Sequence, residues 1–260
     1  MELADGYAEI ETAALNHACV DAVWTHFSKN EKHHFILPDG RTDIILTFLV
    51  DSYGVPTNIT PIIATPSVYS QLITILPHQG FLGIRLKPGV VQNFFTAPLH
   101  AMGNGILNGK RAIFFLQSRH ALQCNCTSIS SLLTELNRFV LGIDSSCKSS
   151  WILDAIKIID ESKGCINVAE TAKQLGLCER TLRRVFLRSV GLSPKAYSST
   201  VRLHNALKLL SNNCDKMACI ASDCGYSDQP HMIRDFKNFT GYTPEFFKGK
   251  QHESLLAQLL

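Results

Sequence analysis

Residues 220–237 read IASDCGYSDQPHMIRDFK, and this stretch decides the fold of the C-terminal part of the chain. A short apolar segment, Met217 to Cys224, leads into the turn Gly225-Tyr226-Ser227, and a second segment runs from Asp228 to Thr240. Two short helices joined by a tight turn that contains glycine are the pattern of a helix-turn-helix unit. We therefore expect residues 217–240 to form such a unit.

The same pattern occurs earlier in the chain, in Val168–Leu175, the turn Gly176-Leu177-Cys178 and Glu179–Val190. A repeat at a fixed offset indicates two copies of one structural unit. In both copies an N-cap hydroxyl and a proline then begin the next helix. The pairs at an offset of 50 residues are Leu182 and Met232, Arg184 and Arg234, Phe186 and Phe236, Gly191 and Gly241, and Ser193-Pro194 and Thr243-Pro244.

The second helix of each copy leaves polar side chains on its outward face. From a helix in the major groove, Arg donates two hydrogen bonds to guanine and Gln pairs similarly with adenine. Lys and the remaining Arg contact phosphates, which adds affinity but little sequence information. The predicted DNA-binding residues are Arg180, Thr181, Arg183, Arg184 and Arg188 in the first copy, and Gln229, His231, Arg234 and Lys237 in the second.

The last 100 or so residues resemble the DNA-binding domain of AraC/XylS-family transcription regulators. The resemblance is carried by residues 220–237, Gly241-Tyr242-Thr243-Pro244 and Phe246, and in the first copy by residues 191–197 and 202–210. It implies two helix-turn-helix units joined by a long helix, about Pro194 to Leu210, with recognition helices in successive major grooves. Two residues depart from the family pattern: Cys178 replaces the usual Ser cap, and Pro230 has no backbone N–H to donate.

The first 127 residues carry short apolar runs at 42–50, 59–64, 68–76, 81–86 and 112–116, separated by Gly and Pro. Short apolar runs that alternate with Gly and Pro are typical of a β-rich sandwich or barrel. Residues 34–45 and 81–89 resemble motifs of an N-terminal regulatory domain of some AraC/XylS regulators, which implies regulation but names no ligand. Arg85 and Lys87 are candidates for an effector pocket, or they form the exposed side of an edge strand.

Apolar residues recur every three or four positions between Ile129 and Ile143, after the cap residue Ser128. This amphipathic helix either packs on the β-rich domain or pairs with its copy in a dimer. The fold class is therefore α+β, an N-terminal β-rich domain followed by an all-α domain. The expected organisation is 1–127 regulatory domain, 128–143 helix, 144–150 Ser-rich linker and 151–250 double helix-turn-helix domain.

The formal net charge of the 260 residues is only +3, but it is unevenly divided. Residues 1–147 hold 9 basic and 11 acidic side chains, and residues 148–260 hold 16 and 11, which gives −2 and +5. The basic excess thus falls in the domain expected to bind DNA. No run approaches a membrane span and the acidic N-terminus is unlike a secretory signal, so we expect a cytoplasmic, nucleoid-associated protein.

Nine cysteines are scattered without a Cys-x-x-Cys pair, which is typical of buried thiols in a reducing compartment. We expect no metal, no cofactor and no catalytic residue, and we interpret Asp39 and Asp43 as turn and cap residues. The expected partners are double-stranded promoter DNA, RNA polymerase, a small-molecule effector and a second copy of the chain, but no membrane. The alternative function is DNA repair, DNA modification or thiol sensing through Cys124 or Cys126, with the helical domain as a DNA anchor.

Overall fold

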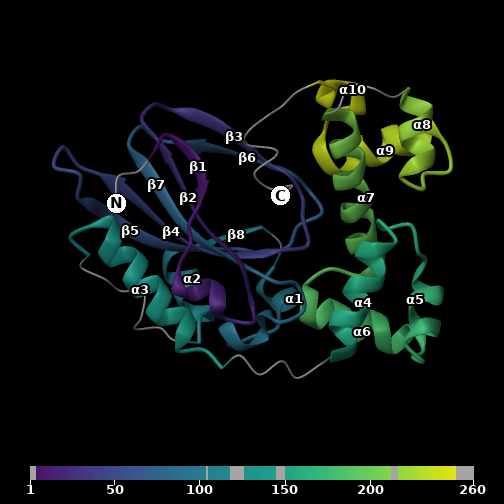
Figure 1. Ribbon diagram of the computed structural model, residues 1–260, viewed down its shortest axis with the longest axis horizontal. Coiled ribbons are helices and arrows are strands. Elements are labelled where there is room, and N and C mark those ends of the chain that lie inside the picture. Colours follow the sequence, from purple (N-terminus) through teal and green to yellow (C-terminus); the bar gives the residue numbers. More distant parts are fainter. Residues whose placement is uncertain (1–3, 104, 118–125, 145–149, 212–215, 250–260) are drawn as a thin grey trace. The chain divides into compact units, whose positions relative to one another are not determined.

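The computed structural model describes residues 4–103, 105–117, 126–144, 150–211 and 216–249 (Figure 1). The chain divides into two compact units. Unit 1 comprises residues 1–34, 41–65 and 74–148, and unit 2 comprises residues 35–40, 66–73 and 149–260. A β-rich region precedes a helical one, as the sequence predicted.

Unit 1 is built on an open, antiparallel six-stranded sheet with β1 and β8 at its edges. In spatial order its strands are β1 (Gly6–Glu9), β2 (Val20–Ser28), β7 (Gln79–Leu86), β4 (Thr42–Val50), β5 (Pro56–Ala64) and β8 (Ile106–Asn108). Strands β3 (Lys32–Ile36) and β6 (Gln71–Ile75) pair in a separate two-stranded sheet. The short elements η1 (Ala13–Asn16), η2 (Val91–Phe94) and α1 (Leu99–Met102) connect the strands.

One face of the six-stranded sheet forms the core of unit 1. Alternate residues of β4, such as Ile44 and Leu46, are fully buried, because successive side chains of a strand point to opposite faces. Helix α3 (Ile129–Leu141) contributes Leu132, Leu136 and Phe139 to the same core, and Ser128 caps it as predicted. The apolar stripe of α3 is therefore used within unit 1, and dimerisation of the chain stays a prediction.

The run Ala112–Leu116, expected as a strand, lies mostly in helix α2 (Gly109–Phe115). Ala112 and Leu116 are both buried, and this spacing of four matches the period of a helix rather than that of a strand. A five-residue apolar run does not by itself distinguish the two periods. The sequence prediction was wrong for this segment.

Arg85 lies on β7, which is an interior strand between β2 and β4 and not an edge strand. Its Nε lies 3.3 Å from Asp43 Oδ1, and the two side chains are 5% and 14% exposed. Asp43 also accepts a hydrogen bond from Trp24 Nε1 at 3.4 Å. Asp43 is thus the partner of a buried cation, and the interpretation as a turn or cap residue was wrong.

Unit 2 is helical and contains two cores that share one long helix. Its helices are α4 (Ser150–Glu161), α5 (Val168–Gln174), α6 (Glu179–Val190), α7 (Pro194–Ser211), α8 (Met217–Asp223), α9 (Gln229–Thr240) and α10 (Pro244–Phe247). Tyr197 near the start of α7 belongs to the core with Phe186, and Leu203 and Leu210 belong to the core with Phe236. Figure 1 shows α7 running from the α4–α6 group to the α8–α10 group.

Two segments from the first half of the sequence also belong to unit 2. In residues 35–40, Leu37 is buried in the same core as Phe236, and the Pro38 carbonyl accepts a hydrogen bond from His204 Nε2 at 2.7 Å. In residues 66–73, the Ser70 backbone N–H and hydroxyl both donate to the Phe239 carbonyl at 2.8 Å. These segments extend the helical unit beyond the predicted residues 151–250.

We predict that Asp43→Asn lowers the free energy of unfolding by about 3 kcal/mol, because it removes the carboxylate charge that lies beside the buried Arg85. The control is Asp21→Asn, which removes the partner of Arg41 from a pair whose side chains are 32% and 34% exposed. That change costs less than about 1 kcal/mol. Urea unfolding monitored by circular dichroism measures both, and equal effects of the two substitutions would contradict the assignment.

Candidate nucleic-acid interface

The two helix-turn-helix units, α5–α6 and α8–α9, repeat the same backbone geometry. Gly176 and Gly225 stand in the two turns with φ of +65° and +71°. The residue after each glycine donates to an alanine carbonyl: Leu177 N to Ala172 O and Tyr226 N to Ala221 O, each at 2.9 Å. The duplication inferred from sequence therefore corresponds to two structural copies.

Both recognition helices, α6 and α9, have 12 residues and end at a left-handed glycine. Gly191 N donates to Leu187 O at 3.0 Å, and Gly241 N donates to Lys237 O at 2.9 Å. The inward positions also match, since Leu182 and Met232, like Phe186 and Phe236, are all 0% exposed. Each recognition helix is thus held by the same two buried side chains and presents the same opposite face.

The starts of the two recognition helices differ, because the second turn contains one more residue than the first. Asp228 is the N-cap of α9, and its carboxylate accepts the backbone N–H of His231 at 2.6 Å. Cys178 is the N-cap of α6 and makes no capping hydrogen bond through its side chain. Pro230 lies in the first turn of α9, where a backbone N–H has no partner within the helix, so its missing donor breaks no helical bond.

The cationic side chains predicted on α6 are exposed, but they are not equivalent. Arg183 is paired with Glu179 one turn earlier, at 2.7 Å. The half-buried Thr181 places its hydroxyl 3.2 Å from the Cys178 thiol. Arg180, Arg184 and Arg188 are exposed and have no ion-pair partner among the described residues. These three arginines are the best placed on α6 to meet an incoming polyanion.

On α9, Gln229, Arg234 and Lys237 are exposed, whereas His231 is engaged within the unit. The His231 ring lies edge-on to Tyr226 at 5.4 Å, and its Nδ1 lies 3.1 Å from the Ser227 hydroxyl. Its Nε2 is 3.9 Å from Asp235 Oδ2. The ring thus supports the turn before α9, and its predicted contact with a base would compete with these interactions.

The Cys178 thiol lies at the exposed start of α6. The hydrogen bond between the Thr181 side chain and the Cys178 thiol lowers the pKa of that thiol below its ordinary value. A lower pKa increases the thiolate fraction at neutral pH, and the thiolate is the reactive form. Cys178 therefore combines an exposed position at the start of α6 with a lowered thiol pKa.

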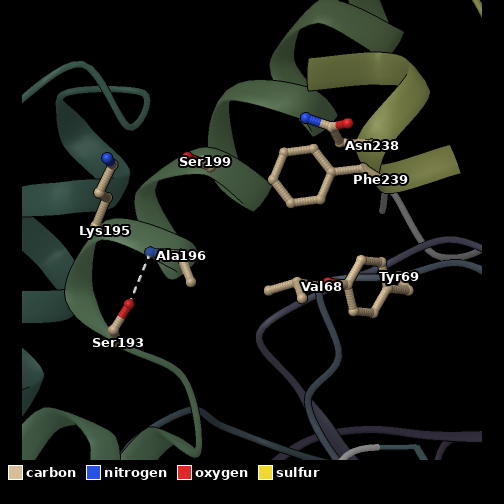
Figure 2. A pocket seen from close by; sticks show the side chains of 8 residues that line it. All are labelled: Val68, Tyr69, Ser193, Lys195, Ala196, Ser199, Asn238 and Phe239. Carbon is tan, nitrogen blue, oxygen red and sulfur yellow. Dashed lines mark hydrogen bonds between the residues drawn. The ribbon is translucent and has the colours of Figure 1, made fainter. Parts of the chain in front are cut away.

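A pocket of about 420 Å³ lies beside α7 (Figure 2). It is lined by Ser193, Lys195, Ala196 and Ser199 near the start of α7, by Asn238 and Phe239 near the end of α9, and by Val68 and Tyr69. The Ser193 hydroxyl accepts the Ala196 backbone N–H at 3.2 Å, so it already caps the helix. Among the eight lining residues Lys195 alone is charged, and it is exposed. The pocket thus lacks a buried charge to orient a ligand.

Arg85 and Lys87, the predicted effector residues, occupy different environments. Arg85 is buried and paired with Asp43, and Lys87 is exposed beyond the end of β7. Close to Arg85 are Trp24 and Tyr7, whose rings stack at a centroid distance of 5.9 Å. Sequence reasoning missed this group, because only the pairing of Asp43 with Arg85 across β4 and β7 brings its members together.

Cys124, named in the alternative function, lies outside the described residues, and Cys126 is half-buried. In the described ranges no group of three or more His, Cys, Asp or Glu side chains is placed to hold a metal ion. No helix within those ranges is long and apolar enough to span a membrane.

Two protein-family models match this chain, one in its N-terminal half and one in its C-terminal half. Residues 171–250 match the family described as "Helix-turn-helix domain", and residues 13–108 match "Domain of unknown function (DUF6597)". The chain is 30% identical over 121 residues to the Msm operon regulatory protein of Streptococcus mutans, covering 46% of this chain and 44% of that protein. It is 31% identical over 80 residues to the transcriptional activator RhaS of Pectobacterium atrosepticum, covering 31% and 29%.

Both alignments span less than half the length of the curated relative. A solved structure of ToxT from Vibrio cholerae aligns with 94% of this chain and 98% of its own, at 14% identity and a TM-score of 0.41. That likeness is too remote to support a shared ligand. The two curated relatives, the Msm operon protein and RhaS, are both named as regulators.

Because α9 has a side-chain N-cap and α6 has none, we predict that substitutions at the two cap residues change the free energy of unfolding in opposite directions. Asp228→Ala removes the cap of α9 and lowers the free energy of unfolding by about 1 kcal/mol. Cys178→Ser introduces a capping hydroxyl at the start of α6 and raises it by up to about 1 kcal/mol. Urea unfolding of both variants checks this, and changes of the same sign would show that the caps do not differ as described.

We also predict that iodoacetamide alkylates Cys178 several-fold faster than the exposed Cys219 at neutral pH. Thr181→Val slows the reaction at Cys178, because it removes the hydrogen bond that contributes most to the lowered pKa. Peptide mass spectrometry over time measures both rates. Equal rates at the two cysteines, or no effect of Thr181→Val, would contradict this account of the thiol.

Proposed function

We propose that this chain, a member of the AraC/XylS family by its C-terminal domain, is a transcription regulator that binds promoter DNA through α6 and α9. The observation that carries this proposal is the duplicated helix-turn-helix geometry, in which both copies expose a cationic helix face. DNA offers one negative charge per about 1.7 Å of helix axis, so exposed arginines and lysines on these helices supply affinity. The proposed activity is binding and regulation, without a catalytic step.

In the proposed complex α6 and α9 lie in successive major grooves. Arg184 and Arg234 stand at equivalent positions and are assigned to guanine edges, and Gln229 is assigned to adenine. Arg180, Arg188 and Lys237 are assigned chiefly to phosphates. Arg183 first has to exchange its contact with Glu179 for one with DNA, and His231 has to leave Tyr226, so both are assigned minor roles.

The N-terminal unit is proposed to sense an effector that alters DNA binding. The support is the buried pair of Arg85 and Asp43 beside the stacked rings of Trp24 and Tyr7, since a fixed ion pair with an aromatic surface suits a small polar ligand. Lys87 is proposed to lie outside this site. Binding of the effector to the N-terminal unit would change the affinity of the C-terminal domain for promoter DNA.

The RhaS relative is named as an activator, which supports activation of a promoter with RNA polymerase as the partner. A chain that binds chromosomal promoters is proposed to reside with the nucleoid, and a second copy would supply further contacts with DNA. The competing function, thiol chemistry at Cys124 or Cys126, is tested by replacing both with Ser. Normal DNA binding and transcription in that variant support the regulator, whereas loss of activity with DNA binding retained supports the alternative.

Genome-wide mapping of DNA bound in cells tests the proposed function. We expect peaks upstream of genes, with a shared motif composed of two elements about one helical turn apart. Binding spread without a shared motif would contradict sequence-specific regulation. The genes beside the peaks would also indicate the chemical class of the effector.

We predict that Arg184→Ala costs about 1–3 kcal/mol of binding at the mapped site and relaxes the preference at one base pair. Lys237→Ala weakens binding to all sequences similarly and reduces the salt slope by about 1. Fluorescence anisotropy with specific and random duplexes over a salt series measures both. The control is Arg138→Ala, an exposed arginine of α3 in unit 1, which leaves binding unchanged. Equal losses on specific and random DNA for Arg184→Ala would refute base reading by that residue.

A further inference from the structure

Two cysteines of unit 2 lie close together, one in the loop before the first helix-turn-helix unit and one in the turn of the second. Cys165 lies in the loop between α4 and α5, and Cys224 is the residue that ends α8. The Cys165 thiol donates to the Cys224 carbonyl oxygen, with an S···O distance of 3.5 Å. Since a carbonyl oxygen is two bonds from its own Cα, the Cys165 sulfur lies within a few ångströms of the Cys224 backbone.

The neighbouring glycines show how closely these segments approach. A Cβ added to Gly225 would lie 2.4 Å from the Cys165 sulfur and 3.1 Å from its Cβ. A Cβ added to Gly164 would lie 2.2 Å from the Ser198 carbonyl on α7. Both glycines have positive φ, +73° at Gly164 and +71° at Gly225. The Cys165 loop is therefore held between α7 and the turn of the second unit.

The two thiols differ in their access to solvent. Cys165 is exposed, and Cys224 is 1% exposed within the core around Phe236. Burial raises the pKa of the Cys224 thiol to about 11, so it stays protonated at neutral pH. A soluble oxidant thus meets Cys165 first, with Cys224 behind it as the partner thiol.

A cationic side chain lies against the loop that carries Cys165. The stem of Arg202, on α7, packs against Gly164, and its guanidinium lies over the Tyr226 ring at 5.4 Å. Arg202 Nε is buried and has no hydrogen-bond partner among the described residues. A soluble oxidant reaches an exposed thiol more readily than a buried one, and Cys165 is the exposed member of the pair.

We propose that Cys165 and Cys224 form a reversible disulfide when the protein meets a peroxide. The Cys165 thiolate attacks one peroxide oxygen, so that an S–O bond forms, the O–O bond breaks and hydroxide leaves. The Cys224 sulfur then attacks the sulfenic sulfur, the S–S bond forms and the S–O bond breaks. The departing hydroxide takes the Cys224 proton and leaves as water, and the hydroxide released in the first step takes up the proton that the Cys165 thiol lost on becoming a thiolate. In total two thiols are oxidised and one hydrogen peroxide is reduced to two water molecules.

This bond would tie the loop that precedes the first helix-turn-helix unit to the turn of the second. A disulfide requires the Cys224 side chain to leave its place in the core, because the sulfur has to face Cys165. Tyr226 is two residues after Cys224 and α9 begins at Gln229, five residues after it, so the second recognition helix shifts. Given the proposed function, we expect the oxidised chain to bind specific DNA about tenfold more weakly, and a thiol reductant to restore binding.

The test treats the reduced full-length chain with hydrogen peroxide, blocks the remaining thiols with N-ethylmaleimide and digests with trypsin. We expect peptide 164–173, which contains Cys165, to be linked to peptide 217–234. The second peptide contains both Cys219 and Cys224, so fragmentation has to place the bond at Cys224. Cys219→Ser retains the link as a matched control, whereas Cys165→Ser and Cys224→Ala each abolish it.

A link at Cys219, or Cys165 recovered only as a sulfinic acid, would overturn the proposal. Equal DNA affinity of the linked and reduced chains would overturn its regulatory part. The proposed function fails separately, if the reduced chain binds no specific DNA while the link still forms. Because Cys165 is exposed, Cys165→Ser is expected to fold normally and to keep DNA binding insensitive to peroxide.

Discussion

The arrangement of the DNA-binding domain depends on α7, because this helix is part of two hydrophobic cores at once. Tyr197 packs with Phe186 of the first helix-turn-helix unit, and Leu203 and Leu210 pack with Phe236 of the second. At 18 residues, α7 is about 27 Å long. Neither recognition helix can move along α7 without exposing a buried aromatic side chain, so α7 fixes their separation.

The net charge of the helical domain limits how strongly it is expected to bind DNA of any sequence. The net charge of +5 over residues 148–260 is modest, and several cations are already paired, such as Arg183 with Glu179. The electrostatic attraction that drives non-specific binding is therefore limited. We therefore propose that selectivity comes from base contacts by residues such as Arg184, Gln229 and Arg234, and from the separation of the two helices.

The sequence predicted the duplicated unit well, because its signals are local: glycines at the turns, a proline after each cap, and aromatics such as Phe186 and Phe236 at matched positions. It did not predict features created by long-range pairing. Asp43 meets Arg85 only through the register of β4 with β7, and Leu37 enters the core around Phe236 from a distant part of the chain. The contact of His231 with Tyr226 was not predicted for a similar reason, since it depends on how the turn folds around the extra residue before α9.

Binding to operators of altered spacing tests most directly whether α7 holds the recognition helices at a fixed separation. Starting from a mapped site, about half a helical turn, ~5 base pairs, is inserted between the two elements, and a second duplex receives a full turn, ~10 base pairs. We predict that both insertions reduce the affinity at least about tenfold, because a helix about 27 Å long cannot extend by another ~34 Å turn. Undiminished binding to either duplex would contradict a rigid α7.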